Sequence, residues 1–334
     1  MQKLLSLPFF LAASTALADV PQVATDIAPV HGLVSRVMQG VGTPELIVPA
    51  GATPHDFALR PSQARALQNA DLVVWMGPAL APWLDRTLDS LSLGAVINLN
   101  TRPETEILDW RASFDDEHED GHPAHDDDEH DKDAHEAHDE EGHAEHEEHG
   151  HDDHDDHDDH DHGDTDPHSW LDPENAQAWS LLIAEALAAA DPDNAATYQA
   201  NAAAAVEEIA AATEAAEALL APHRDTPFLV FHDAYHYFET RFDIHAAGSV
   251  SLGDASAPGP ARVRALQDRV AKEGIACLFA EPQFDRGLIE TLAEGTTARI
   301  ATLDPLGSGI ETGAGFYPAL ITTLAEDMAG CLKG

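Results

Sequence analysis

The stretch DNAATYQANAAAAVEEIAAATEAAEALL, residues 193–220, gives the strongest indication of the architecture. Alanine and glutamate dominate it, and it contains neither glycine nor proline, a composition that strongly favours helix. At about 1.5 Å per residue, a helix of this length spans roughly 40 Å. Such a long helix suits a rigid connector, so we expect one lobe on each side of it.

On both sides of this helix, short apolar runs alternate with amphipathic segments. Before it, the pattern predicts strands at residues 46–48, 71–76 and 95–99 and helices at 61–69, 79–91 and 173–190. After it, strands are predicted at 228–231, 275–280 and 299–303 and helices at 233–241, 260–273, 287–294 and 315–331. This alternation is typical of βαβ units. We therefore predict an α/β protein in which helices flank parallel sheets in both lobes.

The first residues are typical of a secretory signal. Lys3 provides a positive start, residues 4–13 are mostly apolar, and Ala16-Leu17-Ala18 is a small-x-small cleavage site. The apolar run is shorter than the roughly 20 residues that span a bilayer. We expect residues 1–18 to be removed, with no lipid anchor because no cysteine follows, and the mature chain to be periplasmic.

In that oxidising compartment the two cysteines, Cys277 and Cys331, are most simply one disulfide, the alternative being two free thiols.

Charge and histidine are concentrated in residues 115–166. This run contains 27 acidic residues, 14 histidines and one lysine, so it carries −26 of the net charge of −44. Such acidity argues against binding to nucleic acid or anionic membranes. With so few apolar residues the run is expected to be disordered. His151, His154, His157 and His160 recur at every third position, and imidazole suits zinc, copper and nickel. The run is interpreted as a weak accessory metal site, with a solubilising linker as the alternative.

A tight metal site needs ligands on rigid elements, and three of the seven histidines outside the run lie in suitable loops. His55 follows the predicted strand 46–48, His168 precedes the helix at 173, and His232 follows the strand 228–231. In α/β sheets, ligands bind where strands end at their carboxyl side. The other four are His31, His223, His236 and His245.

His232 and His236 also allow a competing interpretation. They stand four apart on a predicted helix, so both could face one metal, as in zinc proteases. However, Asp233 stands where those proteases have glutamate, and no suitable third ligand follows. No Gly-x-Ser-x-Gly elbow and no phosphate-cradling loop occur either. The chain is therefore interpreted as a binding protein and not as an enzyme.

Five motifs resemble the metal-binding solute receptors of ABC importers, and among these the zinc-uptake receptors. The resemblance covers essentially the whole mature chain. The motifs are GATPHDF with LRPS at 51–62, HSWLDP at 168–173, FHDAY at 231–235, FAEPQF at 279–284 and TLDPLG at 302–307.

The resemblance implies two lobes, 19–192 and 222–334, joined by a linking helix at 193–221, with metal bound in the crevice between them. It implies His55 and His168 as ligands from the first lobe and His232 from the second. Manganese receptors have a carboxylate at the position of His232, so a third imidazole favours zinc. The fourth ligand is Asp304 or water; Pro54 replaces a glutamate that some zinc receptors use.

The resemblance further implies that Glu281 supports the site without binding metal, and it favours the Cys277–Cys331 disulfide. The expected function is a monomeric periplasmic receptor that delivers Zn²⁺ to an inner-membrane ABC permease. The main alternative is a periplasmic zinc buffer or chaperone that works without a transporter. A catalytic zinc enzyme is the weaker third alternative, because no motif supplies a general base beside an open coordination position.

Overall fold

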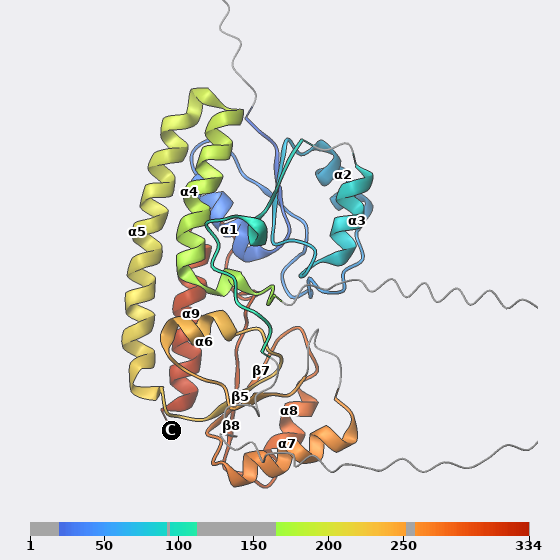
Figure 1. Ribbon diagram of the computed structural model, residues 1–334, viewed down its shortest axis with the longest axis vertical. Coiled ribbons are helices and arrows are strands. Elements are labelled where there is room, and N and C mark those ends of the chain that lie inside the picture. The colour runs from blue at the N-terminus through green and yellow to red at the C-terminus, as the bar shows by residue number, and fades with distance from the viewer. Residues whose placement is uncertain (1–19, 92–93, 112–164, 252–257, 334) are drawn as a thin grey trace, which may run out of the picture. The chain divides into compact units, whose positions relative to one another are not determined.

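The computed structural model describes residues 20–91, 94–111, 165–251 and 258–333. They form two parallel sheets flanked by helices, and one long helix links the two lobes (Figure 1). The predicted fold class is thus confirmed. The predicted signal peptide, residues 1–18, lies outside the described residues. Within the described residues, no helix combines the length and apolar composition that crossing a membrane requires.

The first sheet has the strand order β2-β1-β3-β4, and all neighbouring strands are parallel. In register, Ala24 lies beside Val73, and Val74 lies beside Ile97. Every residue of β3 is buried, which is why its sequence is a continuous apolar run and not an alternating one. The elements of this lobe are β1 (Val23–Thr25), α1 (Ala28–Val37), β2 (Glu45–Leu46), α2 (Pro61–Asn69), β3 (Leu72–Trp75), α3 (Pro82–Ser90), β4 (Ala95–Asn98) and α4 (Pro173–Ala190).

The second sheet repeats this plan with the order β6-β5-β7-β8, again all parallel. Leu278 in β7 lies between Leu229 of β5 and Ile300 of β8, and both leucines are fully buried. The elements are β5 (Phe228–Val230), α6 (His236–Phe242), β6 (Gly248–Ser249), α7 (Pro260–Lys272), β7 (Cys277–Ala280), α8 (Gly287–Ala293), β8 (Arg299–Thr302) and α9 (Phe316–Leu332).

The linking helix is α5 (Ala195–Leu220), which follows a 3₁₀ turn at Pro192–Asn194. It packs against α4 and α9, and Figure 1 shows it alongside both. Its buried residues recur at helical spacing and are mostly alanines, which let neighbouring helices approach closely. They are Tyr198, Ala202, Ala205, Ile209, Ala212, Ala216 and Leu220.

Helix α9 also contacts both lobes, because it packs against β8 of the second lobe and against α1 of the first. At the α1 contact, a Cβ on Gly32 would lie 2.8 Å from Cβ of Phe316, a distance that real side chains do not tolerate. Glycine is therefore required for this approach. Side chains fasten the lobes further: Trp170 Nε1 donates to the carbonyl of Pro305 at 2.9 Å, and Arg241 pairs with Asp172 at 2.8 Å.

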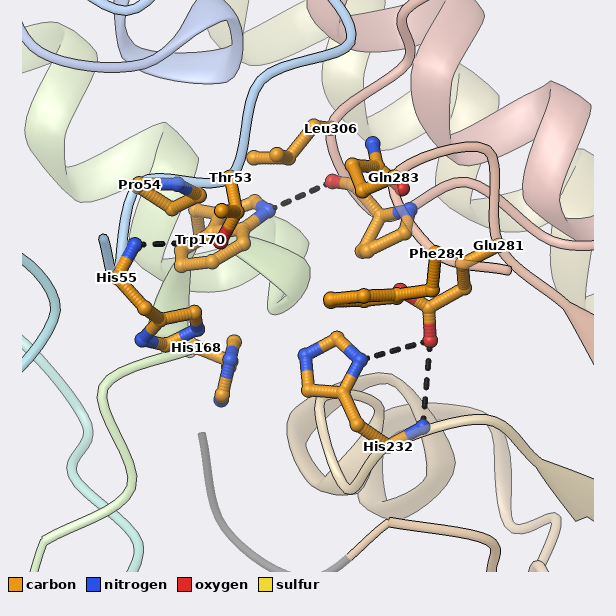
Figure 2. A pocket seen from close by; sticks show the side chains of 11 residues that line it. Thr53, Pro54, His55, His168, Trp170, His232, Glu281, Gln283, Phe284 and Leu306 are labelled. Carbon is orange, nitrogen blue, oxygen red and sulfur yellow. Dashed lines mark hydrogen bonds and ion pairs between the residues drawn. The ribbon is translucent and has the colours of Figure 1, made fainter. Parts of the chain in front are cut away.

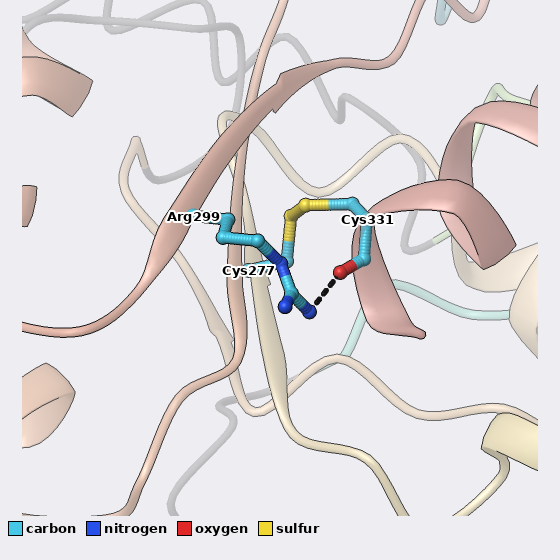
Figure 3. The surroundings of a disulfide bond; sticks show 3 residues. All are labelled: Cys277, Arg299 and Cys331. Carbon is cyan, nitrogen blue, oxygen red and sulfur yellow. Dashed lines mark hydrogen bonds between the residues drawn. A yellow bond between two sulfur atoms is a disulfide. The ribbon is translucent and has the colours of Figure 1, made fainter. Parts of the chain in front are cut away.

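The two cysteines form a disulfide between β7 and α9 (Figure 3). Cys277 and Cys331 are separated by 54 positions in sequence, and their Cα atoms are 6.0 Å apart. The guanidinium of Arg299 in β8 donates to the carbonyl of Cys331 beside the bridge. The predicted disulfide is confirmed, and it ties the final helix to the second sheet.

The structure corrects two predicted boundaries near the histidines. Helix α6 begins at His236 and not at 233, because residues 232–235 form an irregular turn in which the amide of Ala234 donates to the carbonyl of His232. The run that we expected to be disordered as far as residue 166 is ordered at its end. There Thr165 pairs with Asp109 in an antiparallel bridge.

Candidate metal centre

Three histidines from three separate segments converge between the lobes (Figure 2). His55 follows β2, His168 precedes the 3₁₀ turn before α4, and His232 follows β5. Their ligand-capable atoms all lie within 4.8 Å of one another. In the described part of the chain, this is the group of histidine, cysteine and carboxylate side chains that is close enough to hold one metal ion.

His168 is held by a carboxylate that sequence reasoning did not identify. Asp166 Oδ1 accepts from His168 Nδ1 at 2.7 Å and from the His168 amide at 2.9 Å. Both side chains are 1% exposed. The bond to Asp166 assigns the proton to Nδ1, so Nε2 carries the lone pair. His168 Nε2 is buried and has no hydrogen-bond partner. A buried nitrogen in this state suits a metal ion.

His232 is held in the same way by Glu281. Glu281 Oε1 lies 2.8 Å from His232 Nδ1, and both residues are buried. The glutamate follows β7, so the neighbouring strands β5 and β7 deliver the imidazole and its carboxylate to one point. Figure 2 shows Glu281 contacting both the ring and the backbone nitrogen of His232.

The electrostatic environments of these two rings differ. Burial, assisted by the proximity of His232, holds the pKa of His168 well below its ordinary value. Burial is the largest single influence on the pKa of His232 and lowers it, but the charge and hydrogen bond of Glu281, with the charges of Asp233 and Asp166, together raise it by more. The net pKa of His232 is therefore above its ordinary value. His168 is therefore neutral and ready to bind metal. At His232, protons compete with the metal for the ring nitrogen.

His55 is less buried and lies in the loop between β2 and α2. Its amide donates to Thr53 Oγ1 at 3.3 Å. The indole Nε1 of Trp83 in α3 donates to the carbonyl of Pro54 at 2.7 Å, directly before the histidine. The three rings line a pocket whose walls also include Trp170, Phe284 and Leu306.

Asp304 lies outside the three-histidine group. Its Oδ1 accepts from Gln283 Nε2 at 2.9 Å and from the Leu306 amide at 3.1 Å. Its Oδ2 accepts from the amide and the hydroxyl of Ser308 at 2.6 and 2.5 Å. The carboxylate thus organises the turn after β8, and its ligand role stays a prediction.

His236 does not join His232 at a shared metal position. His232 lies before helix α6, so the helical pair of the protease alternative is not formed. His236 Nδ1 instead lies 3.8 Å from Asp166 Oδ2. Of the remaining histidines, His31 Nε2 lies 3.2 Å from the Pro44 carbonyl, and His245 is exposed beside Asp243. His151, His154, His157 and His160 lie outside the described residues.

The segment that precedes the histidine-rich run and the last residues of the run meet beside this centre. Tyr237 from the second lobe receives a hydrogen bond from the Leu108 amide at 2.9 Å and donates one to the Asp166 carbonyl at 3.0 Å. In the preceding segment, the ring of Trp110 packs edge-on against His168, with centroids 5.8 Å apart. The one sequence signal for Asp166 is its position two residues before the candidate ligand His168, although the sequence does not show that Asp166 is buried.

Two parallel-sheet lobes on a long helix, with histidines from both lobes converging, define a solute receptor with a metal site. The family model of the periplasmic component A of zinc-uptake complexes (ZnuA) matches residues 23–331. The chain belongs to this family, which comprises solute receptors and not enzymes.

Individual relatives agree with this assignment. The chain is 48% identical over 323 residues to the high-affinity zinc uptake system protein ZnuA of Paracoccus denitrificans, covering 96% of this chain and 94% of that protein. It is 43% identical over 314 residues to the ZnuA of Brucella suis, covering 93% and 91%. The crystal structure of a zinc-bound ZnuA deletion mutant superposes with a TM-score of 0.69 at 20% identity, covering 94% and 98%.

Proposed function

We propose that this chain is a periplasmic receptor that binds Zn²⁺ through His55, His168 and His232 and delivers it to an inner-membrane ABC importer. The observation that carries the proposal is the convergence of the three histidines, whose ligand-capable atoms lie within 4.8 Å of one another, with the Nε2 atom of His168 buried and unpartnered. The names of the relatives, all zinc-uptake proteins, support zinc as the cargo.

The ligand set favours zinc on chemical grounds. Three neutral imidazoles suit a borderline-soft ion, and zinc binds such nitrogens at about 2.0–2.1 Å in a tetrahedron. Tetrahedral angles then place the nitrogens roughly 3.4 Å apart, a small contraction from the observed limit of 4.8 Å. Water is the favoured fourth ligand, because the Asp304 oxygens already accept four hydrogen bonds.

The two carboxylates behind the rings make the site tight. Asp166 and Glu281 each accept from an Nδ1 atom, which fixes the ring orientation and makes the opposite nitrogen a stronger base. Because His168 belongs to the first lobe and His232 to the second, one ion cross-links both lobes. A permease that separates the lobes, or the segments that carry these ligands, would break the coordination and release zinc.

The remaining predictions complete this function. Residues 1–18 direct export, and the mature receptor is a periplasmic monomer made of lobes 19–192 and 222–334 with the linking helix 193–221. The histidine-rich run, including the histidines at 151–160, binds additional zinc weakly. Its position in sequence, ending just before His168, supports a role in supplying or reporting zinc next to the tight site.

Zinc titrations of the purified mature protein against a competing chelator test the tight site. His55→Ala, His168→Ala and His232→Ala should each abolish stoichiometric tight binding, whereas His245→Ala, an exposed control, should preserve it. Retention of tight binding by any of the first three variants contradicts the ligand assignment.

Transport by the permease reconstituted in proteoliposomes, with and without the receptor, separates a receptor from a zinc buffer. A buffer would bind zinc equally well and leave transport unchanged.

A further inference from the structure

The loop that carries His55 is attached to a regular element through one side chain whose role is otherwise unassigned. Trp83 in α3 is partly buried, and its ring packs on Phe57 with centroids 5.4 Å apart. Its Nε1 donates to the carbonyl of Pro54 at 2.7 Å. Phe57 and Pro54 lie on either side of His55, so the indole contacts the loop just before and just after the ligand.

The bond to Pro54 acts on His55 through the peptide plane. The Pro54 carbonyl and the His55 amide belong to the same planar unit, which also contains the Cα atom of His55. Trp83 holds the oxygen edge of this plane, and Thr53 Oγ1 accepts from the nitrogen edge at 3.3 Å. With both edges held, rotation of this plane is restrained, and so is the position of the His55 Cα atom relative to α3.

The three ligands therefore differ in how they are held. His168 and His232 are almost fully buried and are each oriented by a buried carboxylate on the ring itself. His55 is more exposed, and the backbone just before it is held by Trp83. We propose that Trp83 is the positioning residue for His55, and that its hydrogen bond to Pro54 controls how readily His55 releases zinc. This inference rests on the proposed zinc site.

The decisive measurement is the rate of zinc dissociation, followed by transfer to an excess of chelator in stopped flow. Trp83→Phe keeps an aromatic ring against Phe57 but removes the indole N–H. One lost hydrogen bond should accelerate dissociation by about 3- to 10-fold. Thr53→Val removes the other edge contact without changing the side-chain volume greatly, and it should accelerate dissociation in the same direction.

Trp179→Phe is the matched control. Trp179 is fully buried in α4 and donates its Nε1 to Thr105 Oγ1 at 2.8 Å, so the substitution is identical and also removes one hydrogen bond. It should lower the melting temperature of the zinc-free protein at least as much as Trp83→Phe does, yet leave the zinc dissociation rate unchanged. If Trp83 had a purely structural role, the zinc dissociation rates of Trp83→Phe and Trp179→Phe would instead rise in proportion to the loss of melting temperature in each variant.

The outcomes separate this inference from the zinc site itself. If wild type binds zinc tightly, His55→Ala loses that binding and Trp83→Phe dissociates at the wild-type rate, the role of Trp83 is wrong and the site stands. Equal acceleration by Trp83→Phe and Trp179→Phe likewise overturns it. If His55→Ala binds like wild type, the zinc assignment itself fails. Should Trp83→Phe not fold, Trp83→Tyr, which also lacks the N–H, takes its place with the same expectation.

Discussion

Asp166 Oδ1 accepts a hydrogen bond from His168 Nδ1 at 2.7 Å, so the final residue of the histidine-rich run orients a ligand of the candidate metal centre. Asp166 is 1% exposed, and its carbonyl is bound by Tyr237 of the other lobe. The boundary between the run and the tight site therefore lies before this residue and not after it.

Asp166→Ala should weaken zinc binding about 10- to 100-fold, the range typical for loss of a carboxylate that supports a metal-binding histidine. Asp166→Asn should weaken it less, because the amide oxygen can still accept from Nδ1. Chelator competition at neutral pH measures both affinities. Asp109→Ala is the control, since this carboxylate is exposed on the other side of the Thr165 bridge. An unchanged affinity for Asp166→Ala would contradict the supporting role.

A pair of deletions tests where the run ends. Removing residues 112–164 leaves the bridge between Asp109 and Thr165 intact, so the tight zinc site should keep its affinity while the number of weak sites falls. Removing residues 115–166 also takes Asp166, so this protein should lose tight affinity to about the same extent as Asp166→Ala. Isothermal titration of both proteins gives stoichiometry and affinity together. Identical tight binding by the two deletions would show that Asp166 belongs to the run, as its composition suggests, and does not support the tight site.

The raised pKa of His232 predicts how acidity affects zinc binding. A protonated imidazole cannot bind metal, so affinity should fall as the pH drops through the pKa of His232, starting above the ordinary histidine value of about 6.5. The lowered pKa of His168 keeps that ring neutral throughout this range. Glu281→Gln removes the charge that raises the pKa of His232, so the fall should begin at a lower pH.

Affinities of wild type and Glu281→Gln, measured from roughly pH 5.5 to pH 8, show this shift directly. At the alkaline end Glu281→Gln should bind more weakly, because the amide makes the ring a poorer base. Glu290→Gln, an exposed carboxylate in α8 paired with Arg286, makes the same charge change away from the site. A pH profile of Glu281→Gln that coincides with that of wild type would mean that His232 does not govern the acid sensitivity.

The disulfide should stabilise the second lobe without tuning the metal centre. Closing a loop of 54 positions contributes about 4 kcal/mol to the free energy of unfolding in the chain-entropy treatment. Cys277→Ser combined with Cys331→Ser should lose most of this in urea denaturation. Cys277 begins β7 and Glu281 follows its other end, so zinc affinity should change little. A large loss of affinity in the folded double variant would contradict this separation.

The sequence predicted most of the regular elements and the three histidines that the structure brings together, but it missed helix α1, strands β1 and β6 and the contacts between segments. The helices at 61–69 and 173–190 were predicted with their observed bounds, because proline marks the first position of each. The short strands β1 and β6 gave no such signal, since two or three residues show no period. His55, His168 and His232 were identified by their places at loop edges and by resemblance.

Asp166 and Trp83 were missed for a physical reason. Composition assigned Asp166 to a solvated acidic run, yet burial between the lobes depends on Tyr237, which lies far away in sequence. Trp83 has an ordinary place in an amphipathic helix, and its importance comes from a carbonyl that sequence patterns do not describe. The predicted start of α6 at 233 was wrong because helix-favouring residues there adopt a turn that presents His232.

The bridge between Asp109 and Thr165, with the Tyr237 hydroxyl bound to both strands, gives the chain a closed stem next to its metal centre. Whatever is inserted between these two points begins and ends at the same place, so its length and composition can change without moving His168. A fluorescent protein inserted between these two residues would therefore lie close to the candidate metal centre, and the core of the receptor would be unchanged.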